Sequence, residues 1–383
     1  RKRAWYTNGL MMVATHAQAL VYRLLTLMPS AHMRATLQCL LALFLELQRP
    51  RPQHSQTKSA AALSRFLNRY GWPTGRAMRA TRQSSKRLIN SYLKSHRGRL
   101  PIVYAVVDLT CLEKTGKYPE LQGLVRRYNG KRGVHVALLY LAIGPFRFPW
   151  SFRVYRGKGT ATPTQLALKL LAQIPPSWRE RFKIRVLADA GFSTTALIPG
   201  AQKLGFEVLM SLCFDRRLAD GQAVKTVAKR GQRVTLKDLE LPVTLSWFWR
   251  KHEDTGERER HFVVATEVLS GGYIVRLGKR RWAIEACFKV LKHQFGWDAF
   301  GQGTRLGMYR WWILAFISYL LAHWQFLASK QTTLDWQQAA HQARQQWFPQ
   351  EVLACFLQEL AAVRPTLTEL GIDIKLARVP VAV

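Results

Sequence analysis

Three carboxylates stand at positions where an acidic side chain is unusual in this sequence. The chain has 23 Asp and Glu against 58 Lys and Arg, so the placement of each acidic residue carries information. Asp108 and Asp189 each end a short apolar run, and Glu285 lies on a predicted helix. Taken singly, an Asp at a strand end is most often a turn or cap residue, and a helical Glu is most often a surface residue. Together the three form a candidate catalytic set.

The chemistry open to such a set is metal-dependent phosphoryl transfer. Three carboxylates in one place repel one another unless cations neutralise them, and hard oxygen ligands suit Mg²⁺ or Mn²⁺. Two such ions about 4 Å apart can activate a water or a 3′-hydroxyl and stabilise the leaving oxygen of a phosphodiester. The formal net charge of +35 favours a polyanionic partner. The sequence therefore indicates DNA or RNA as the substrate.

The segments around the two Asp residues predict a sheet that would bring them together. Short apolar runs rich in β-branched residues favour buried strands, and between residues 101 and 214 the predicted order is β-β-β-α-β-α-β. If the first and fourth strands are neighbours, Asp108 and Asp189 reach the same edge of the sheet. Residues 215–275 are predicted to be an insertion of further strands.

The helix predicted from Lys279 to about Gln294 combines a polar face with an apolar one. At about 100° per residue, Glu285 shares its face with three cations, and an adjacent apolar stripe would turn toward the core. The alternative is ordinary i,i+4 pairing of Glu285 with its cationic neighbours, which contributes only about a few tenths of a kcal/mol. That alternative does not explain why the carboxylate follows two strands that already carry placed Asp residues. The cations are Arg281, Lys289 and Lys292, and the stripe is Ile284, Phe288, Leu291 and Phe295.

Residues 1–100 are the most asymmetric part of the chain, with eighteen basic residues and one acidic residue, Glu46. Such asymmetry predicts a helical, basic DNA-binding region. Within it, residues 58–96 have helical spacing on both sides of Gly71-Trp72-Pro73, and the second half carries a basic face. Two interpretations stay open, a helix-turn-helix-like unit and a solvated pair of basic helices. The basic face consists of Arg76, Arg79, Arg82, Lys86 and Arg87.

Cysteine usage and hydropathy indicate a cytoplasmic protein. The five Cys are scattered without CxxC or Cys/His ligand spacing, which argues against a disulfide framework or a zinc site. Trp311–Ala328 is apolar but contains Ser318, His323 and Gln325, so it predicts a buried amphipathic helix and no membrane partner. The basic opening is followed by an apolar stretch that polar residues interrupt, so we expect no signal peptide.

Around the three carboxylates, the sequence resembles the DDE-type transposases of bacterial insertion sequences, in the IS-four superfamily. Arg281, Glu285 and Lys292 fit the family signature Y-x2-R-x3-E-x6-K at the required spacing, with Gly278 at the Tyr position. The D-x-G-F pattern that starts at Asp189 is similar to the family's second motif. The stretch DLTCLEKTGK, which starts at Asp108, is similar to its first motif. The resemblance covers roughly residues 60–330.

The resemblance implies an α/β fold, with a ribonuclease-H-like mixed sheet, a β-rich insertion and helical N-terminal and C-terminal regions. It implies that Asp108, Asp189 and Glu285 are the catalytic residues and bind two Mg²⁺ or Mn²⁺ ions. Arg281 and Lys292 would then hold phosphates of the transposon end, and Lys289 beside them is also assigned to DNA binding.

The resemblance also extends to the insertion and to the overall activity. Trp249, with Trp247, is a candidate for stacking on a flipped base, although core packing is the more frequent role of such a W-F-W strand. The expected boundaries are 1–100 for the DNA-binding region, 101–300 for the catalytic core with the insertion at about 215–275, and 301–383 for the C-terminal region.

The expected activity is cleavage at the terminal repeats of an insertion sequence and joining to double-stranded target DNA. A homodimer in a synaptic complex on the DNA of the nucleoid would carry it out. Two alternatives remain open from the sequence. The first is a nuclease of the same fold that cuts without joining. The second is a catalytically decayed transposase copy that binds DNA without metal-dependent cleavage.

Overall fold

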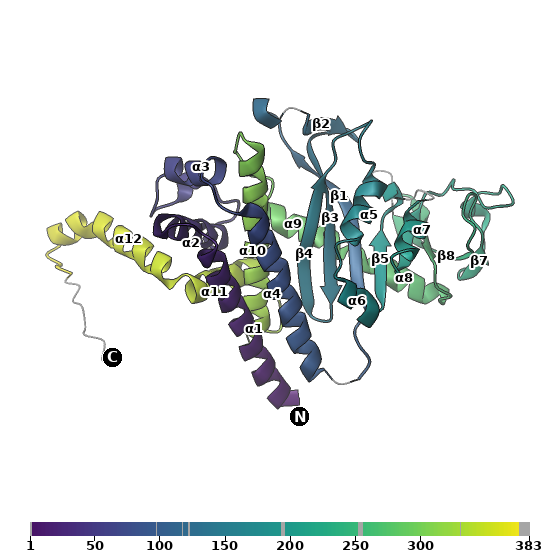
Figure 1. Cartoon of the computed structure of the whole chain (residues 1–383), viewed down its shortest axis with the longest axis horizontal. Helices are drawn as coiled ribbons and strands as arrows, with labels where there is room; N and C mark the ends of the chain where they lie inside the picture. The colour runs from purple at the N-terminus through teal and green to yellow at the C-terminus, as the bar shows by residue number, and fades with distance from the viewer. Residues whose placement is uncertain are drawn as a thin grey trace.

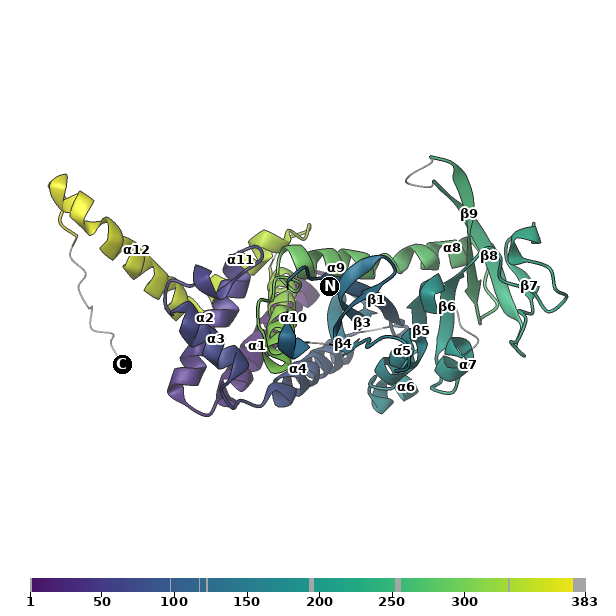
Figure 2. The ribbon, with the colours of Figure 1, turned by 90° about the horizontal axis from the view of Figure 1, so that it is seen from above.

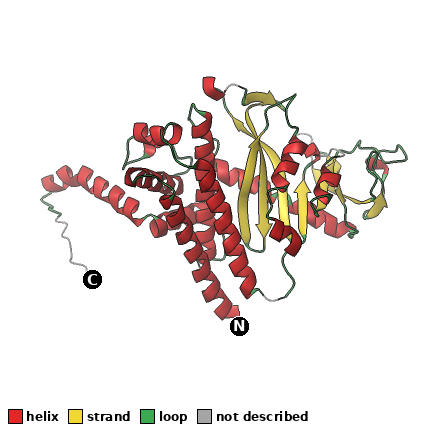
Figure 3. Cartoon of the chain, in the orientation of Figure 1, coloured by secondary structure: helices red, strands yellow, loops and turns green. Residues whose placement is uncertain are grey.

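The computed structural model describes residues 2–96, 98–116, 118–121, 123–192, 196–251, 256–329 and 331–374. Both ends of the chain form a helical part that lies beside one large mixed sheet (Figure 1). Coloured by secondary structure, the two parts separate clearly, with strands confined to one side of the molecule (Figure 3). The predicted α/β class with helical terminal regions is confirmed.

The centre of the sheet has the strand order that places the two Asp residues side by side. Its path runs β2-β3-β1-β5-β6-β9-β8-β7, and β4 pairs with β3. β1, β5 and β6 run parallel to one another, whereas β3 is antiparallel to β1 and β4 is antiparallel to β3. The order β4-β3-β1-β5-β6 is that of a ribonuclease-H-like sheet, and β1 and β5 are the predicted first and fourth strands. These strands are β1 (Val103–Glu113), β2 (Val125–Tyr128), β3 (Lys131–Ile143), β4 (Phe146–Val154), β5 (Ile184–Ala188) and β6 (Glu207–Leu212).

The β-rich insertion continues the same sheet. Its strands are β7 (Gln232–Val234), β8 (Val243–Lys251) and β9 (Arg258–Ala265). β9 pairs antiparallel with β6 and β8 pairs antiparallel with β9. The insertion is therefore tied by backbone hydrogen bonds to β6 at the edge of the central strands.

Helices cover both faces of the sheet (Figure 2). One face holds α5 (Pro163–Leu171), α6 (Pro176–Arg181) and α7 (Leu197–Gln202), and the other holds α8 (Gly271–Arg280) and α9 (Ala283–His293). α5 starts at Pro163, because Thr162 and Gln165 form a reciprocal capping box that satisfies the first backbone N–H groups.

The helix predicted from Lys279 to Gln294 is instead two helices, which corrects the sequence-based expectation. α8 ends at Arg280 and α9 begins at Ala283, so Arg281 and Trp282 form the junction. The apolar stripe is buried as predicted, since Ile284, Phe288, Leu291 and Phe295 all lie in the core. The break places Glu285 in the first turn of α9.

The helical part is built from both termini around α10. Four N-terminal helices, α1 to α4, all contact it. α10 is long and apolar enough to cross a membrane, but 78% of its most apolar window is buried inside the protein. The helices are α1 (Lys2–Thr26), α2 (Ala31–Glu46), α3 (Ala60–Asn68), α4 (Thr74–Ser95), α10 (Arg305–Ala328), α11 (Trp336–Trp347) and α12 (Pro349–Glu369), and short 3-10 helices occupy Pro52–His54, Pro119–Leu121, Ala190–Phe192 and Val224–Thr226.

A buried arginine fastens α10 to the N-terminal helices. The Arg310 guanidinium donates hydrogen bonds to the carbonyl oxygens of Phe66, Leu67 and Trp72 and to the Thr74 hydroxyl. It also lies 4.4 Å from the centre of the Trp72 ring. These contacts satisfy carbonyls at the end of α3, which have no partner within that helix. The N-terminal region therefore shares its core with α10.

Candidate active site

Asp108 and Asp189 lie next to each other at the point where β1 and β5 stop pairing. The last parallel pair is Val107 with Ala188, and each Asp is the next residue in its chain. Neighbouring strands are about 4.8 Å apart, so the two carboxyl groups share one edge of the sheet. Asp108 was expected at the tip of its strand, and this detail is wrong. β1 continues to Glu113, paired only with β3 beyond this point.

The Asp108 carboxyl is buried, with Arg281 as its ion-pair partner. Only 8% of the residue is exposed, and its Oδ1 accepts a hydrogen bond from the backbone N–H of Leu109 at 2.7 Å. Burial raises the pKa of the Asp108 carboxyl to about 7, the neighbouring Asp189 carboxylate adds to the rise, and Arg281 opposes it. Two neighbouring carboxylates repel each other when both are ionised, so the site attracts a cation.

Asp189 is held at the start of the turn that follows β5. Its Oδ1 accepts a hydrogen bond from the backbone N–H of Gly191 at 3.0 Å. Burial raises the pKa of Asp189, while Arg281 and the Gly191 N–H lower it. A side chain at position 191 would place its Cβ 3.2 Å from Asp189 Oδ1. The glycine of the D-x-G-F pattern therefore leaves room for the carboxylate.

Arg281 links the third carboxylate to the first. Its guanidinium lies 3.4 Å from Asp108 Oδ2 and 2.9 Å from Glu285 Oε1. Only 11% of the Arg281 side chain is exposed, against 49% for Glu285. Glu285 thus reaches the Asp pair through a cation that lies between them.

Lys292 contacts β1 just beyond Asp108, where its ammonium is engaged by the strand. It donates to the Thr110 hydroxyl at 2.9 Å and to the Cys111 carbonyl at 3.0 Å. Thr110 is two residues beyond Asp108 and so projects from the same face of β1. An ammonium has three donors, so one remains for another acceptor. Lys289 is exposed on α9, four residues after Glu285.

The two tryptophans of the insertion lie together on β8 within a group of arginines. Trp249 is 53% exposed, whereas Trp247 is partly buried, with the Arg230 guanidinium 4.2 Å and the Arg260 guanidinium 4.8 Å from its ring centre. Arg260 also lies 5.8 Å from the ring centre of Trp249. Core packing therefore describes Trp247 better than Trp249.

One pair of polar residues near the site has no signal in the sequence. His261 on β9 hydrogen bonds with the Ser211 hydroxyl on β6 at 2.9 Å, one strand beyond Asp189. Burial lowers the pKa of the His261 imidazole, and the charges of Arg250 and Arg281 lower it further. His261 and Ser211 are 50 positions apart in the sequence, and the pairing of β6 with β9 brings them together.

The residues present fit divalent cations only in part. Within the described ranges, no three His, Cys, Asp or Glu side chains lie close enough to hold one metal ion. The buried Asp108 and the half-buried Asp189 supply a pair of hard oxygen ligands, as Mg²⁺ or Mn²⁺ prefers. Glu285 is the ligand that stands apart, and Arg281 already occupies the place of a cation between Glu285 and Asp108.

Gly278, which stands at the Tyr position of the signature, lies in α8 and faces β9. A Cβ at this position would meet Val263 of β9 at 3.5 Å, an ordinary contact distance. Tyr273, the nearest preceding tyrosine, hydrogen bonds with Arg185 near the opposite end of β5. Tyr273 therefore does not take the place of the tyrosine that the motif has at this position.

Comparisons with known proteins identify the family. The family described as "Transposase DDE domain" matches residues 102–321, more than half of the chain and all three carboxylates. No curated protein matches. Among solved structures, the chain is similar to one described as "Cryo-EM structure of piggyBac transposase synaptic complex with hairpin DNA (SNHP)". The two are 9% identical, with a TM-score of 0.44, and the match covers 90% of this chain and 79% of the other. On the family match, this chain belongs to the DDE-domain transposases.

Proposed function

We propose that this transposase cleaves double-stranded DNA at the ends of its insertion sequence and joins the ends to target DNA, in the cytoplasm on the DNA of the nucleoid. The observation that carries the proposal is the pair formed by the buried Asp108 and the half-buried Asp189 at the shared edge of β1 and β5. The net charge of +35 supports a polyanionic substrate.

In this proposal Asp108, Asp189 and Glu285 hold two Mg²⁺ or Mn²⁺ ions. When bound, such ions supply activation of the attacking oxygen and charge stabilisation at the leaving oxygen. Arg281 neutralises Asp108 and Glu285 in the free protein. When these carboxylates bind metal ions, its guanidinium would be released to contact a DNA phosphate. Its planar guanidinium suits both partners, because it binds carboxylates and phosphates in the same forked geometry. Lys292 fixes α9 against β1 and offers its remaining donor to the DNA, and the exposed Lys289 adds a further phosphate contact.

Trp249 is proposed to stack on a base released from the cut end. Its half-exposed indole and the neighbouring Arg260 offer an aromatic face and a cation on the same strand pair. Base–aromatic stacking of this kind is tolerant of sequence.

Cleavage and joining are tested by incubating the protein with Mg²⁺, a duplex that carries the ends of its own element, and a plasmid target. We expect nicked ends first and then ends covalently joined to the plasmid. Nicking without joining, even from pre-cut ends, would identify a nuclease of the same fold. Tight binding without any metal-dependent nick would identify a decayed copy.

Mg²⁺ should stabilise the folded protein measurably, because it relieves repulsion between the adjacent carboxylates of Asp108 and Asp189. A ligand at about 100 times its dissociation constant contributes about 2.7 kcal/mol to the stability of the folded state. Differential scanning calorimetry with and without Mg²⁺ should therefore show a rise of several degrees in the unfolding midpoint. Asp108→Asn should remove most of that rise, and an undiminished rise in this variant would place the ion elsewhere.

We also propose that the protein acts as a homodimer, with α12 in the contact between subunits. α12 extends away from the rest of the molecule (Figures 1 and 2) and has no buried residue over its described length. Leu353, Phe356, Leu357 and Val363 expose 38–57% of their surfaces at helical spacings that form one apolar stripe. Light scattering should give the mass of two chains, and Phe356→Glu with Leu357→Glu should give one. An unchanged mass in this variant would assign the contact to another surface.

A further inference from the structure

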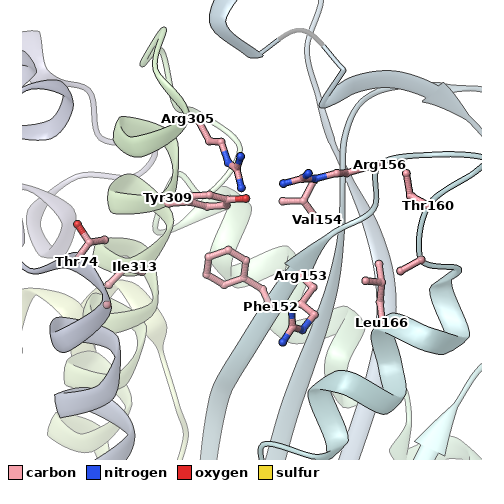
Figure 4. A pocket seen from close by; sticks show the side chains of 12 residues that line it. Thr74, Phe152, Arg153, Val154, Arg156, Thr160, Leu166, Arg305, Tyr309 and Ile313 are labelled. Carbon is pink, nitrogen blue, oxygen red and sulfur yellow. The ribbon is translucent and has the colours of Figure 1, made fainter.

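A second basic site lies between the sheet and the helical part. It is a pocket of about 570 Å³, formed by the end of β4, the loop that leads into α5, and the first turns of α4 and α10. Arg305 and Arg156 point toward each other across the hydroxyl end of Tyr309, and Phe152 lies below that ring (Figure 4). None of these residues belongs to the carboxylate site.

The pocket lies at the same edge of the sheet as the carboxylates. Val154, in the pocket wall, pairs with Val136 of β3, and Val136 pairs with Thr110 of β1. Thr110 is two residues beyond Asp108. Two strand spacings of about 4.8 Å separate β4 from β1, so a DNA strand bound at Asp108 would need only one or two nucleotides to reach the pocket.

The charge in the pocket is unbalanced. Arg153, Arg156 and Arg305 are exposed, and within the described part of the chain none of them has an ion pair or a hydrogen bond. No Asp or Glu is among the described residues that line it. Thr304 and Thr162 already cap α10 and α5, so the attraction for an anion comes from the arginines. Exposed arginines are common in so basic a chain, but Arg156 and Arg305 converge on one hollow, whereas Arg153 points away from them (Figure 4).

The rest of the lining is apolar and aromatic. Phe152, Val154, Leu166 and Ile313 line the pocket, and the Tyr309 ring is supported by Phe152 and Trp312 at centroid distances of 5.8 and 5.7 Å. The volume falls in the range of roughly 300–1,000 Å³ that holds a small molecule. A ligand that combines an anion with a flat apolar ring fits both halves of this lining.

We propose that this pocket binds one unpaired nucleotide of the DNA strand that passes the carboxylates. Its phosphate lies between Arg156 and Arg305, and its base lies against Tyr309. The inference rests on the proposed DNA partner but not on the cleavage chemistry.

The test measures binding of two fluorescent probes by anisotropy, the oligonucleotide dT8 and an abasic strand with the same number of phosphates. Arg156→Gln with Arg305→Gln should weaken both about fourfold at about 0.15 M salt and lower the salt slope by about 0.7, the value for one phosphate contact on a single strand. Tyr309→Leu keeps an apolar side chain against Phe152 and should weaken dT8 about tenfold while leaving the abasic strand unchanged, because only dT8 has a base to stack.

The matched control is Arg181→Gln with Lys203→Gln, two exposed cations just before β5 and β6, at the opposite edge of the sheet. It removes the same charge and should leave both probes within twofold of the wild type. Equal losses in the control, or no loss in the arginine variant, would overturn the site. Equal effects of Tyr309→Leu on both probes would overturn the base contact.

A direct readout uses photo-crosslinking of an eight-nucleotide strand with 5-bromodeoxyuridine, followed by mass spectrometry of the attached peptide. We expect attachment at Tyr309 that Arg156→Gln with Arg305→Gln abolishes, whereas attachment only to other segments contradicts the proposal. Arg156→Lys with Arg305→Lys keeps the charge and should retain the salt slope, which separates phosphate binding from a folding defect. The proposed function is tested separately, by the assay of metal-dependent cleavage of duplex ends, so its failure can be distinguished from failure of the pocket proposal.

Discussion

Asp108→Asn should reduce cleavage of the DNA ends by about 10³-fold or more and leave their binding intact or stronger. Asn fills the same volume and can still accept the Leu109 N–H bond, but it lacks the charge that a divalent cation requires. A loss of about 10³-fold corresponds to about 4 kcal/mol of transition-state stabilisation, which is within the several kcal/mol that a bound metal contributes. Binding should not suffer, because one negative charge is removed from the path of a polyanion.

Asp189→Asn and Glu285→Gln should have the same effect on cleavage, measured in the same gel assay with labelled ends and Mg²⁺. The matched control is Glu113→Gln, an exposed carboxylate on β1 that pairs with Lys131 at 3.5 Å. This control should cleave at the wild-type rate. Cleavage near that rate in Asp108→Asn, Asp189→Asn or Glu285→Gln would remove that residue from the catalytic set.

The adjacency of Asp108 and Asp189 could be predicted because it depends on a strong local pattern. Each follows a run of buried apolar residues, and parallel neighbours bring the same ends of their strands together. The continuation of β1 beyond Asp108 could not be predicted in this way. Residues 109–113 are held by the antiparallel partner β3. Their mixed polarity does not indicate whether the strand ends at Asp108 or continues.

The break between α8 and α9 has no marker in the sequence. Neither Pro nor Gly stands at Arg281 or Trp282, and the apolar spacing continues through them. The break is tertiary in origin, because α8 packs on β6, β8 and β9, whereas α9 packs on β1 and α10. The ion pair of Arg281 with Asp108 also depends on tertiary packing, because the two residues are 173 positions apart in the sequence. Local sequence patterns therefore could not predict it.

The packing of the N-terminal helices on the C-terminal helix α10 also could not be predicted from local sequence patterns. The basic composition of residues 1–100 suggests an independent region, but α1 to α4 bury their apolar faces against α10. Deleting the region would therefore expose α10 and the Arg310 contacts, so loss of DNA binding in such a truncation would not identify a DNA-binding surface. Substitutions of exposed cations test that role without opening the core.

Arg76→Gln, Arg79→Gln and Arg87→Gln together should lower the salt slope of duplex binding by about 2.7. These three arginines are the exposed members of the predicted basic face of α4, whereas Arg82 donates to Gln173 at 2.8 Å. Each phosphate contact releases counterions worth about 0.9 in the slope of log K against log salt. At about 0.15 M salt, three lost contacts correspond to roughly 10²-fold in affinity by the same relation.

The measurement is a salt titration of anisotropy with two duplexes, one that carries the element's ends and one of unrelated sequence. A control with Arg181→Gln, Lys203→Gln and Lys237→Gln removes three exposed cations that are remote from α4 in sequence. If α3 and α4 read DNA as a helix-turn-helix-like unit, the α4 variant loses preference for the ends as well as slope, because base contacts carry sequence specificity. If they are a solvated basic pair that binds only the backbone, both duplexes weaken equally. A slope that falls no further than in the control would show that α4 does not contact DNA, and the recognition surface would then lie on another part of the chain.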